Sequence, residues 1–226
     1  MKRFYKEVSV AEGTILLDGR GVKTPARAAL AVPFPALAEA IADEWRAQGE
    51  EIDPRAMPMT GLANAAIDRV APDPVAFARP LAAYAATDLL CYRADSPPEL
   101  IAEEAVAWDP LLDWARERYD IHFVTTSGIV HTAQPPATIA RLGEALAARD
   151  AFALAAMSPL VTIGGSLVVA LAVAEGGIDA GDAFDAAHLD ELWQARQWGE
   201  DALATETRDR RRQDFLNAAR FILLAR

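Results

Sequence analysis

The sequence has little of what holds small secreted domains or metal sites together. Its single cysteine, Cys91, cannot form an internal disulfide, so nothing indicates an oxidising compartment. Its neighbours are largely apolar, and we interpret the thiol as a small buried group and not a reactive one. Only three histidines are present, and none has the spacing of a zinc site. A chain of 226 residues can bury a hydrophobic core without disulfides or a structural metal ion.

Positive charge is also scarce. The chain has 22 Lys and Arg against 33 Asp and Glu, which gives a net charge of −11. General binders of nucleic acid or anionic membranes need clustered positive charge, so the composition argues against both classes. The one basic cluster, residues 208–212, is interleaved with Glu206, Asp209 and Asp214, and we interpret it as a solvated helix face.

Long apolar runs and leader sequences are missing. The first residues, Met1–Glu7, are charged and no apolar stretch follows them, unlike a secretory signal or a transit peptide. The longest uncharged segment, 151–174, is interrupted by Pro159 and by the pair Gly164 and Gly165. Its longest clean piece would reach only about 14 Å, against the ~30 Å of a membrane core. We therefore expect a cytoplasmic protein.

Motifs of nucleotide-binding and hydrolytic enzymes are missing as well. Neither of the glycine-rich phosphate-binding motifs, Gly-x-x-x-x-Gly-Lys-Ser/Thr and Gly-x-Gly-x-x-Gly, occurs in the sequence. The segment 164–168 resembles the serine-hydrolase motif Gly-x-Ser-x-Gly but lacks its last glycine. The glycine pair permits a tight turn before a helix, with Ser166 as its N-cap. Carboxylates elsewhere in the chain leave one enzymatic alternative open, a small-molecule enzyme with an acidic site near Ser166.

Turn residues and apolar periodicity divide the chain into a strand-rich and a helix-rich part. We predict the α+β class, with a small N-terminal α+β domain at residues 1–95 and a larger all-helical C-terminal domain at residues 96–226. A short hairpin over 121–131 can pack back on the first domain. Strands are predicted at 4–10, 14–17, 22–25, 29–32 and 88–93, and helices at 34–49, 61–70, 74–87, 98–118, 136–149, 151–157, 166–174, 180–204 and 208–225.

One predicted helix near the C-terminus carries an unusual face. Glu191, Gln194, Trp198 and Asp201 are spaced three, four and three apart, so they lie along one side of it. A tryptophan among polar residues is typical of binding surfaces, where an aromatic anchor sits in a polar rim. The alternative is a buried Trp198 with polar neighbours. The stripe expected to face the core consists of Leu189, Leu192, Trp193 and Leu203.

Several short motifs follow one another over most of the chain. They are Arg3–Lys6, Leu17–Arg20, Lys23–Pro25, Glu44–Trp45 with Gln48, Met57–Thr60, Asn64–Asp68, Tyr84 with Asp88–Arg93, Trp108–Leu111, Gly165–Ser166, Ala170–Ala172, Asp190–Glu191 and Gln194 with Trp198–Asp201. In this order and spacing they resemble the chaperone family that assembles the F1-ATPase, the catalytic sector of ATP synthase, by binding its alpha subunit.

The resemblance implies a function and a partner. It implies a non-enzymatic chaperone without a cofactor, which binds the unassembled alpha subunit and prevents its aggregation until beta subunits replace it. The expected molecule is a monomer of the bacterial cytoplasm that neither binds nucleic acid nor inserts into membranes. A protein adaptor with another client is the remaining alternative.

Together with the helix face, the resemblance indicates where the partner binds. The predicted partner-binding residues are Glu191, Gln194, Trp198, Glu200 and Asp201. Either Glu200 or Asp201 is then the family's functional acid, and the sequence leaves both open. No residue is assigned a catalytic, cofactor-binding or metal-binding role.

Overall fold

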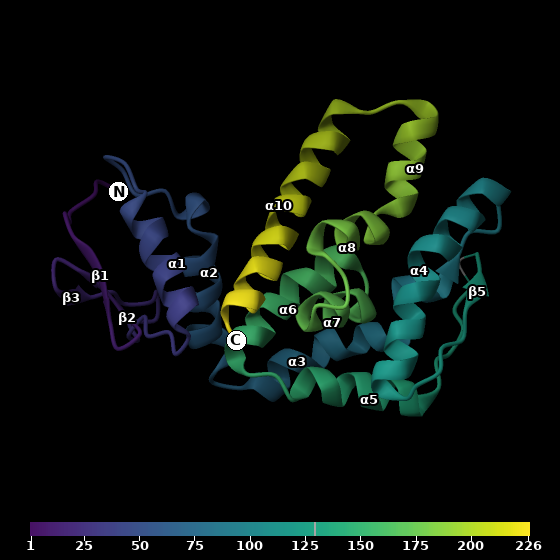
Figure 1. Ribbon diagram of the computed structural model, residues 1–226, viewed down its shortest axis with the longest axis horizontal. Helices are drawn as coiled ribbons and strands as arrows, with labels where there is room; N and C mark the ends of the chain where they lie inside the picture. Colours follow the sequence, from purple (N-terminus) through teal and green to yellow (C-terminus); the bar gives the residue numbers. More distant parts are fainter. Residues whose placement is uncertain (129) are drawn as a thin grey trace. The chain divides into compact units, whose positions relative to one another are not determined.

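The computed structural model describes residues 1–128 and 130–226 (Figure 1). The chain forms two compact units, each of which is made from more than one segment. Unit 1 comprises Met1–Phe77, Asp150–Ala156 and Arg220–Arg226, and unit 2 comprises Ala78–Arg149 and Met157–Ala219. The division falls inside three helices, namely α3 (Pro74–Ala82), α6 (Ala151–Gly164) and α10 (Ala202–Leu224). The strands lie mainly in the first part of the chain and the helices dominate the rest, as the predicted α+β class requires.

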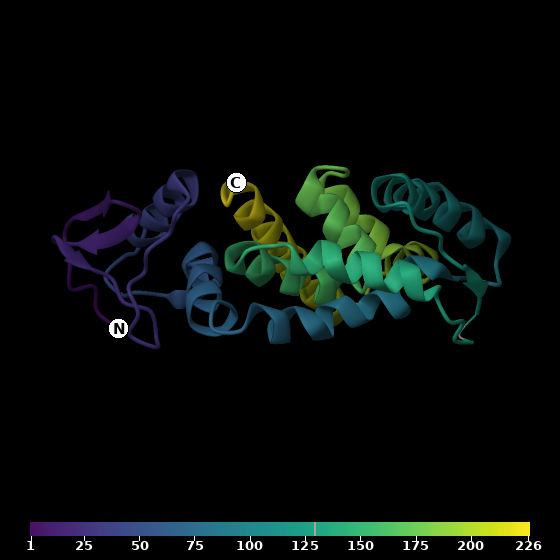
Figure 2. The same cartoon turned by 90° about the horizontal axis from the view of Figure 1, so that it is seen from below.

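Unit 1 begins with a three-stranded antiparallel sheet. The strands are β1 (Val8–Ala11), β2 (Thr14–Leu17) and β3 (Arg20–Gly21). Asp18 and Gly19 both have positive φ, as a tight turn between twisted strands requires, and they connect β2 to β3. Helix α1 (Pro35–Arg46) covers the sheet (Figure 2). The core between them includes Ile15, Leu17, Leu37 and Ile41.

A carboxylate of α1 holds the start of α2 (Pro58–Ala65). Glu44 accepts hydrogen bonds from the backbone N–H of Met59 at 2.6 Å and of Thr60 at 2.8 Å, and from the Thr60 hydroxyl at 2.7 Å. These are the N–H groups that a helix start leaves unpaired, and negative charge is favourable there. Burial nevertheless raises the pKa of Glu44 above its ordinary value, because desolvation outweighs these bonds. One π-helical turn, Ala66–Val70, continues from α2 toward α3.

Unit 2 is built around α7 (Leu167–Glu175). Every side chain from Leu167 to Ala174 is buried, which explains the charge-free sequence of this segment. Helices α4 (Pro98–Tyr119) and α8 (Ala180–Ala187) pack on it, and the buried indole of Trp108 on α4 donates to the carbonyl of Ala186 on α8 at 2.8 Å. The other helices with residues in unit 2 are α5 (Pro136–Ala147), α9 (Leu189–Trp198) and parts of α3, α6 and α10.

The glycine turn before α7 is a structural cap. Gly165 has a φ of 64°, and the Ser166 hydroxyl accepts from the N–H of Val169 at 3.0 Å, which confirms the predicted N-cap. Ser166 also donates to Asp88 at 2.7 Å, and Asp88 accepts from the N–H of Val168 at 3.0 Å. Both side chains are fully buried, and burial raises the pKa of Asp88. A substrate cannot reach the hydroxyl or the carboxylate in this arrangement.

The predicted hairpin over 121–131 is wrong for the residues of that segment that the structure describes. Strand β5 (Thr126–Ser127) pairs in parallel with the distant β4 (Tyr92–Arg93). The backbone at Val124 exchanges two hydrogen bonds with the side-chain amide of Gln134, at 3.0 and 2.7 Å. Side chains here satisfy the backbone groups that a second hairpin strand would otherwise satisfy.

Two helix predictions also change. The helix predicted at 151–157 continues through Pro159 to Gly164 as α6, and the single helix predicted at 180–204 is three separate segments: α8, α9 and the first residues of α10. The residue before α9, His188, has a φ of −113° and ends α8. Among the residues that the structure describes, no helix is both long enough and apolar enough to cross a membrane.

Candidate partner-binding site

Four of the five predicted partner-binding residues lie where α9 (Leu189–Trp198) turns into α10, and Glu191 lies in the first turn of α9. Helix α9 ends at Trp198, and Gly199 follows with a φ of 90°, a backbone conformation that glycine adopts most readily. Asp201 then accepts a hydrogen bond from the N–H of Ala204 at 2.8 Å and begins α10. Asp201 is therefore not on the face of α9, and the prediction of one continuous helical face is wrong. We call residues Gln194–Leu203 the α9–α10 tip (Figure 1).

The tip exposes two large apolar side chains. Trp198 is 75% exposed and Leu203 is 72% exposed, one on each side of Gly199. The Trp198 ring packs edge-on against the buried ring of Trp193, with centroids 5.8 Å apart, so the exposed ring has a fixed support. The prediction that Leu203 faces the core is wrong. Gly199 was the sequence signal for the break between α9 and α10, because a glycine ends a helix more often than it continues one.

A buried arginine ties the polar residues of the site together. Arg208 on α10 reaches Glu191 on α9 at 3.5 Å and Glu200 in the turn at 2.9 Å, and its side chain is only 9% exposed. A hydrogen bond from Thr205 and the Arg208 charge lower the pKa of Glu200. The interpretation of residues 208–212 as a solvated face is therefore wrong for Arg208. Helical periodicity does not distinguish a buried arginine from an exposed one.

The other predicted residues are free to meet a partner. Gln194, Trp198, Glu200 and Asp201 are exposed, whereas Glu191 is half-buried beneath its pairs with Arg208 and Arg211. The structure thus brings four of the five predicted residues to the α9–α10 tip, and Glu191, in the first turn of α9, is joined to Glu200 through Arg208.

Helix α4 contacts α9 beside the tip through two carboxylates. Glu103 forms an ion pair with Arg196 at the surface. Glu104 is buried and accepts from the N–H of Ala94 at 2.9 Å. Burial and the neighbouring carboxyl group of Asp190 raise the pKa of Glu104 to about 7. A proton held by Glu104 lets the two carboxyl groups share a hydrogen bond, which joins α4 to the first turn of α9.

A shallow groove and further exposed apolar groups adjoin this contact. The groove, of about 310 Å³, lies between α4, α8 and α9 and is lined in part by Ala107, Leu189 and Leu192. Val106 on α4 is 78% exposed and Ile101 is also exposed. No sequence signal indicated that either residue is exposed, because the two faces of α4 differ only weakly in polarity. Exposed apolar groups within a polar rim suit contact with another protein.

The described residues of the site contain none of the groupings of three or more histidine, cysteine, aspartate or glutamate side chains that could hold a metal ion. His188 is buried, hydrogen-bonds the carbonyl of Phe184 at 3.0 Å, and stacks on the Phe184 ring. Burial lowers its pKa. The exposed groups at the tip can be buried by a partner protein and can form hydrogen bonds with it, as the residues of a protein–protein contact surface do.

Comparison with known proteins gives concordant matches. The family described as ATP12 chaperone protein matches residues 2–116. The crystal structure of Atp12 from Paracoccus denitrificans is 41% identical, with a TM-score of 0.95 over 100% of this chain and 98% of that one. A mutant of the same Atp12p gives the same values. A protein of Agrobacterium tumefaciens is also 41% identical, with a TM-score of 0.94 over 100% of this chain and 86% of that one. These matches confirm the resemblance found in the sequence.

Proposed function

The chain belongs to the ATP12 chaperone family, and from this premise we propose that it assists assembly of the F1 sector of ATP synthase by binding the free alpha subunit. In this proposal it covers an apolar surface of the unassembled subunit until beta subunits replace it. The action needs contact and release and no catalysis. Its site is the α9–α10 tip.

The observation that carries the site assignment is the exposed pair Trp198 and Leu203. Large apolar side chains this accessible are unfavourable in water, and a partner that buries them gains free energy. Trp198 is the anchor in this proposal, because aromatic residues dominate the energetics of protein interfaces and its ring is already held by Trp193. An anchor fixed before binding loses less entropy on association.

The polar residues supply the rim. Gln194 is exposed beside Trp198 on α9, and Glu200 and Asp201 carry exposed carboxylates in the turn. Glu200 is held by Thr205 and Arg208, and Asp201 uses one oxygen to begin α10. Each retains acceptor capacity for a partner's N–H groups. A polar rim of this kind suits a complex that must later dissociate.

The direct test is co-expression with the alpha subunit of the same organism's ATP synthase. We expect the chain to raise the soluble yield of alpha and to co-elute with it on a sizing column. If alpha aggregates equally with and without the chain, the proposed client is wrong. A stable complex with a different protein and none with alpha would favour the adaptor alternative.

A further inference from the structure

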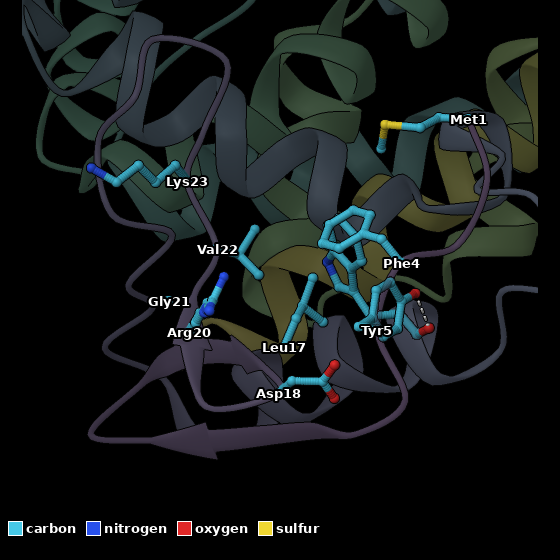
Figure 3. A pocket seen from close by; sticks show the side chains of 10 residues that line it. Met1, Phe4, Tyr5, Leu17, Asp18, Arg20, Gly21, Val22 and Lys23 are labelled. Atoms are coloured by element: carbon cyan, nitrogen blue, oxygen red, sulfur yellow. Dashed lines mark hydrogen bonds between the residues drawn. The ribbon is translucent and has the colours of Figure 1, made fainter.

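Unit 1 contains a pocket of about 560 Å³ between the N-terminal segment, the strands β2 and β3, and α1 (Figure 3). Figure 3 shows Phe4, Leu17 and Val22 converging on it from three separate segments of the chain. Two large apolar residues that line it are unusually accessible: Phe4 is 65% exposed and Met1 is 73% exposed. The pocket therefore offers apolar surface that folding has not buried.

The aromatic groups of the pocket form a fixed platform. The Tyr5 ring packs edge-on against Phe4, at 5.4 Å between centroids, and against Trp45, at 5.7 Å. The Tyr5 hydroxyl donates to the backbone carbonyl of Trp45 at 2.6 Å, and the Arg3 guanidinium lies over the Tyr5 ring. The indole N–H of Trp45 is buried and has no hydrogen-bond partner among the described residues.

The charge around the pocket has the opposite sign to the rest of the chain. Residues 1–32 contain six Lys and Arg against three Asp and Glu, whereas residues 33–226 contain 16 against 30. Arg20 and Lys23 line the pocket, and neither takes part in the ion pairs found among the described residues. The one lining carboxylate, Asp18, accepts from the N–H groups of Lys6 at 3.0 Å and Glu7 at 2.8 Å, which lowers its pKa.

We propose that this pocket binds an acidic segment of a partner protein through one large apolar side chain, preferably an aromatic one. The apolar side chain packs against Phe4, Leu17 and Val22, where ring edges favour another ring. The acidic flanks meet Arg20 and Lys23, neither of which forms a salt bridge among the described residues, although the charge of Arg20 also acts on Asp18. The inference goes beyond the proposed function, because it uses no residue of the α9–α10 tip and does not depend on the identity of the client.

The test is fluorescence anisotropy of the full chain with a labelled peptide, Gly-Asp-Asp-Phe-Asp-Asp-Gly. Two control peptides replace the Phe by Ser or every Asp by Asn. We expect the first peptide to bind about fivefold or more tightly than either control, since both the ring and the charges contribute. Raising sodium chloride from about 50 mM to about 500 mM should weaken its binding. No binding, or equal binding of all three peptides, would overturn the proposal.

Matched variants locate the binding. Phe4→Ser and the double variant Arg20→Gln with Lys23→Gln should each weaken the peptide about fivefold or more. Val75→Ser and Arg55→Gln change exposed residues of unit 1 outside the pocket and should leave its affinity unchanged. Equal affinity in all four variants would contradict the pocket assignment.

Binding to phosphatidylglycerol vesicles in place of the peptide would show a lipid site and refute a peptide site. None of these measurements involves the alpha subunit, so the two proposals can fail separately.

Discussion

At the scale of single residues, accessibility distinguishes two kinds of aromatic and basic side chains near α9. Trp193 is buried and Trp198 is exposed, although they are five positions apart in the same helix. Arg208 is buried and Arg210 is exposed, although both are on α10. Substitution of the buried Trp193 or Arg208 should therefore affect folding, and substitution of the exposed Trp198 should affect binding.

Trp198→Ser should leave the protein folded but impair client binding. Because the side chain is 75% exposed, we expect the free energy of unfolding to change by less than about 1 kcal/mol. Urea denaturation followed by circular dichroism measures this change. Co-elution with the alpha subunit should fall strongly, and Leu203→Ser should act in the same direction. Val75→Ser provides an exposed apolar control. Normal co-elution by the double variant Trp198→Ser with Leu203→Ser would show that the tip is not the binding site.

Arg208→Gln should destabilise the protein. The substitution leaves Glu191 and Glu200 without their buried counter-charge, and we expect a loss of about 1–3 kcal/mol, because both carboxylates keep some access to solvent. Arg210→Gln is the matched control on the same helix, where an exposed pair with Glu206 should contribute less than about 0.5 kcal/mol. Urea midpoints compare the two variants. Equal midpoints would mean that Arg208 contributes no more than a surface pair.

At the scale of elements, helix ends and helix contacts carry much of the specificity of the fold. Glu44 holds the start of α2, and Asp88 with Ser166 holds the start of α7. The α4–α9 contact uses the Glu104 and Asp190 carboxyl groups and places the first turn of α9. That contact depends on pH, because the pKa of Glu104 is raised to about 7.

The carboxyl group of Glu104 should make stability fall with rising pH. Its pKa in the folded protein is about 7, above the ordinary value of 4.5, so the folded chain holds a proton that the unfolded chain releases. Its stabilising contribution is complete below about pH 4.5 and is lost as the pH rises through about 7. We expect Glu104→Gln to remove up to roughly 3 kcal/mol of this pH dependence, because Gln keeps the acceptor for Ala94 and the donor for Asp190.

The measurement is urea denaturation of the wild type and of Glu104→Gln at intervals from about pH 4.5 to about pH 8. Glu117→Gln, exposed on the same helix, is the control and should follow the wild-type curve. If the difference in unfolding free energy between Glu104→Gln and the wild type does not vary with pH, the raised pKa of Glu104 is refuted.

Local signals predicted most helices and the first strands, but the strands predicted at 22–25 and 29–32 form only isolated bridges, and 88–93 is a 3-10 turn followed by the two-residue β4. The Asp18–Gly19 turn and the Ser166 cap were predictable, because residue type alone meets their backbone requirements. The 121–131 hairpin failed because β5 pairs with β4, which is more than thirty positions away in the sequence. At the candidate site, the partner-binding role of the five residues stays a prediction, the break at Gly199 was overlooked, and the burial of Arg208 depends on packing that no local pattern encodes.

At the scale of the whole molecule, the compact units do not follow the order of the chain. Unit 1 includes Asp150–Ala156 and Arg220–Arg226 in addition to the first 77 residues. Phe34 packs edge-on against Phe152 at 5.5 Å, and Phe152 stacks on Phe221 at 6.3 Å. Phe221 is fully buried, and Arg220 acts electrostatically on Glu44. The domain limits 1–95 and 96–226 remain a prediction, and these contacts within unit 1 argue that residues 1–95 lack part of their core.

A fragment of residues 1–95 should therefore fail to fold cooperatively. It lacks the rings of Phe152 and Phe221, whose burial contributes about 1.5–3 kcal/mol each, against a total stability of about 5–15 kcal/mol for a typical domain. Thermal melting by circular dichroism and a proton–nitrogen NMR spectrum test the fragment. In the full chain, Phe221→Ala should lower the free energy of unfolding by about 3–5 kcal/mol, and Leu223→Ala, half exposed two positions later, by less than about 1 kcal/mol. A dispersed spectrum and a sharp melt for the fragment would instead establish residues 1–95 as an independent domain, and the C-terminal aromatic contacts would then be dispensable for its folding.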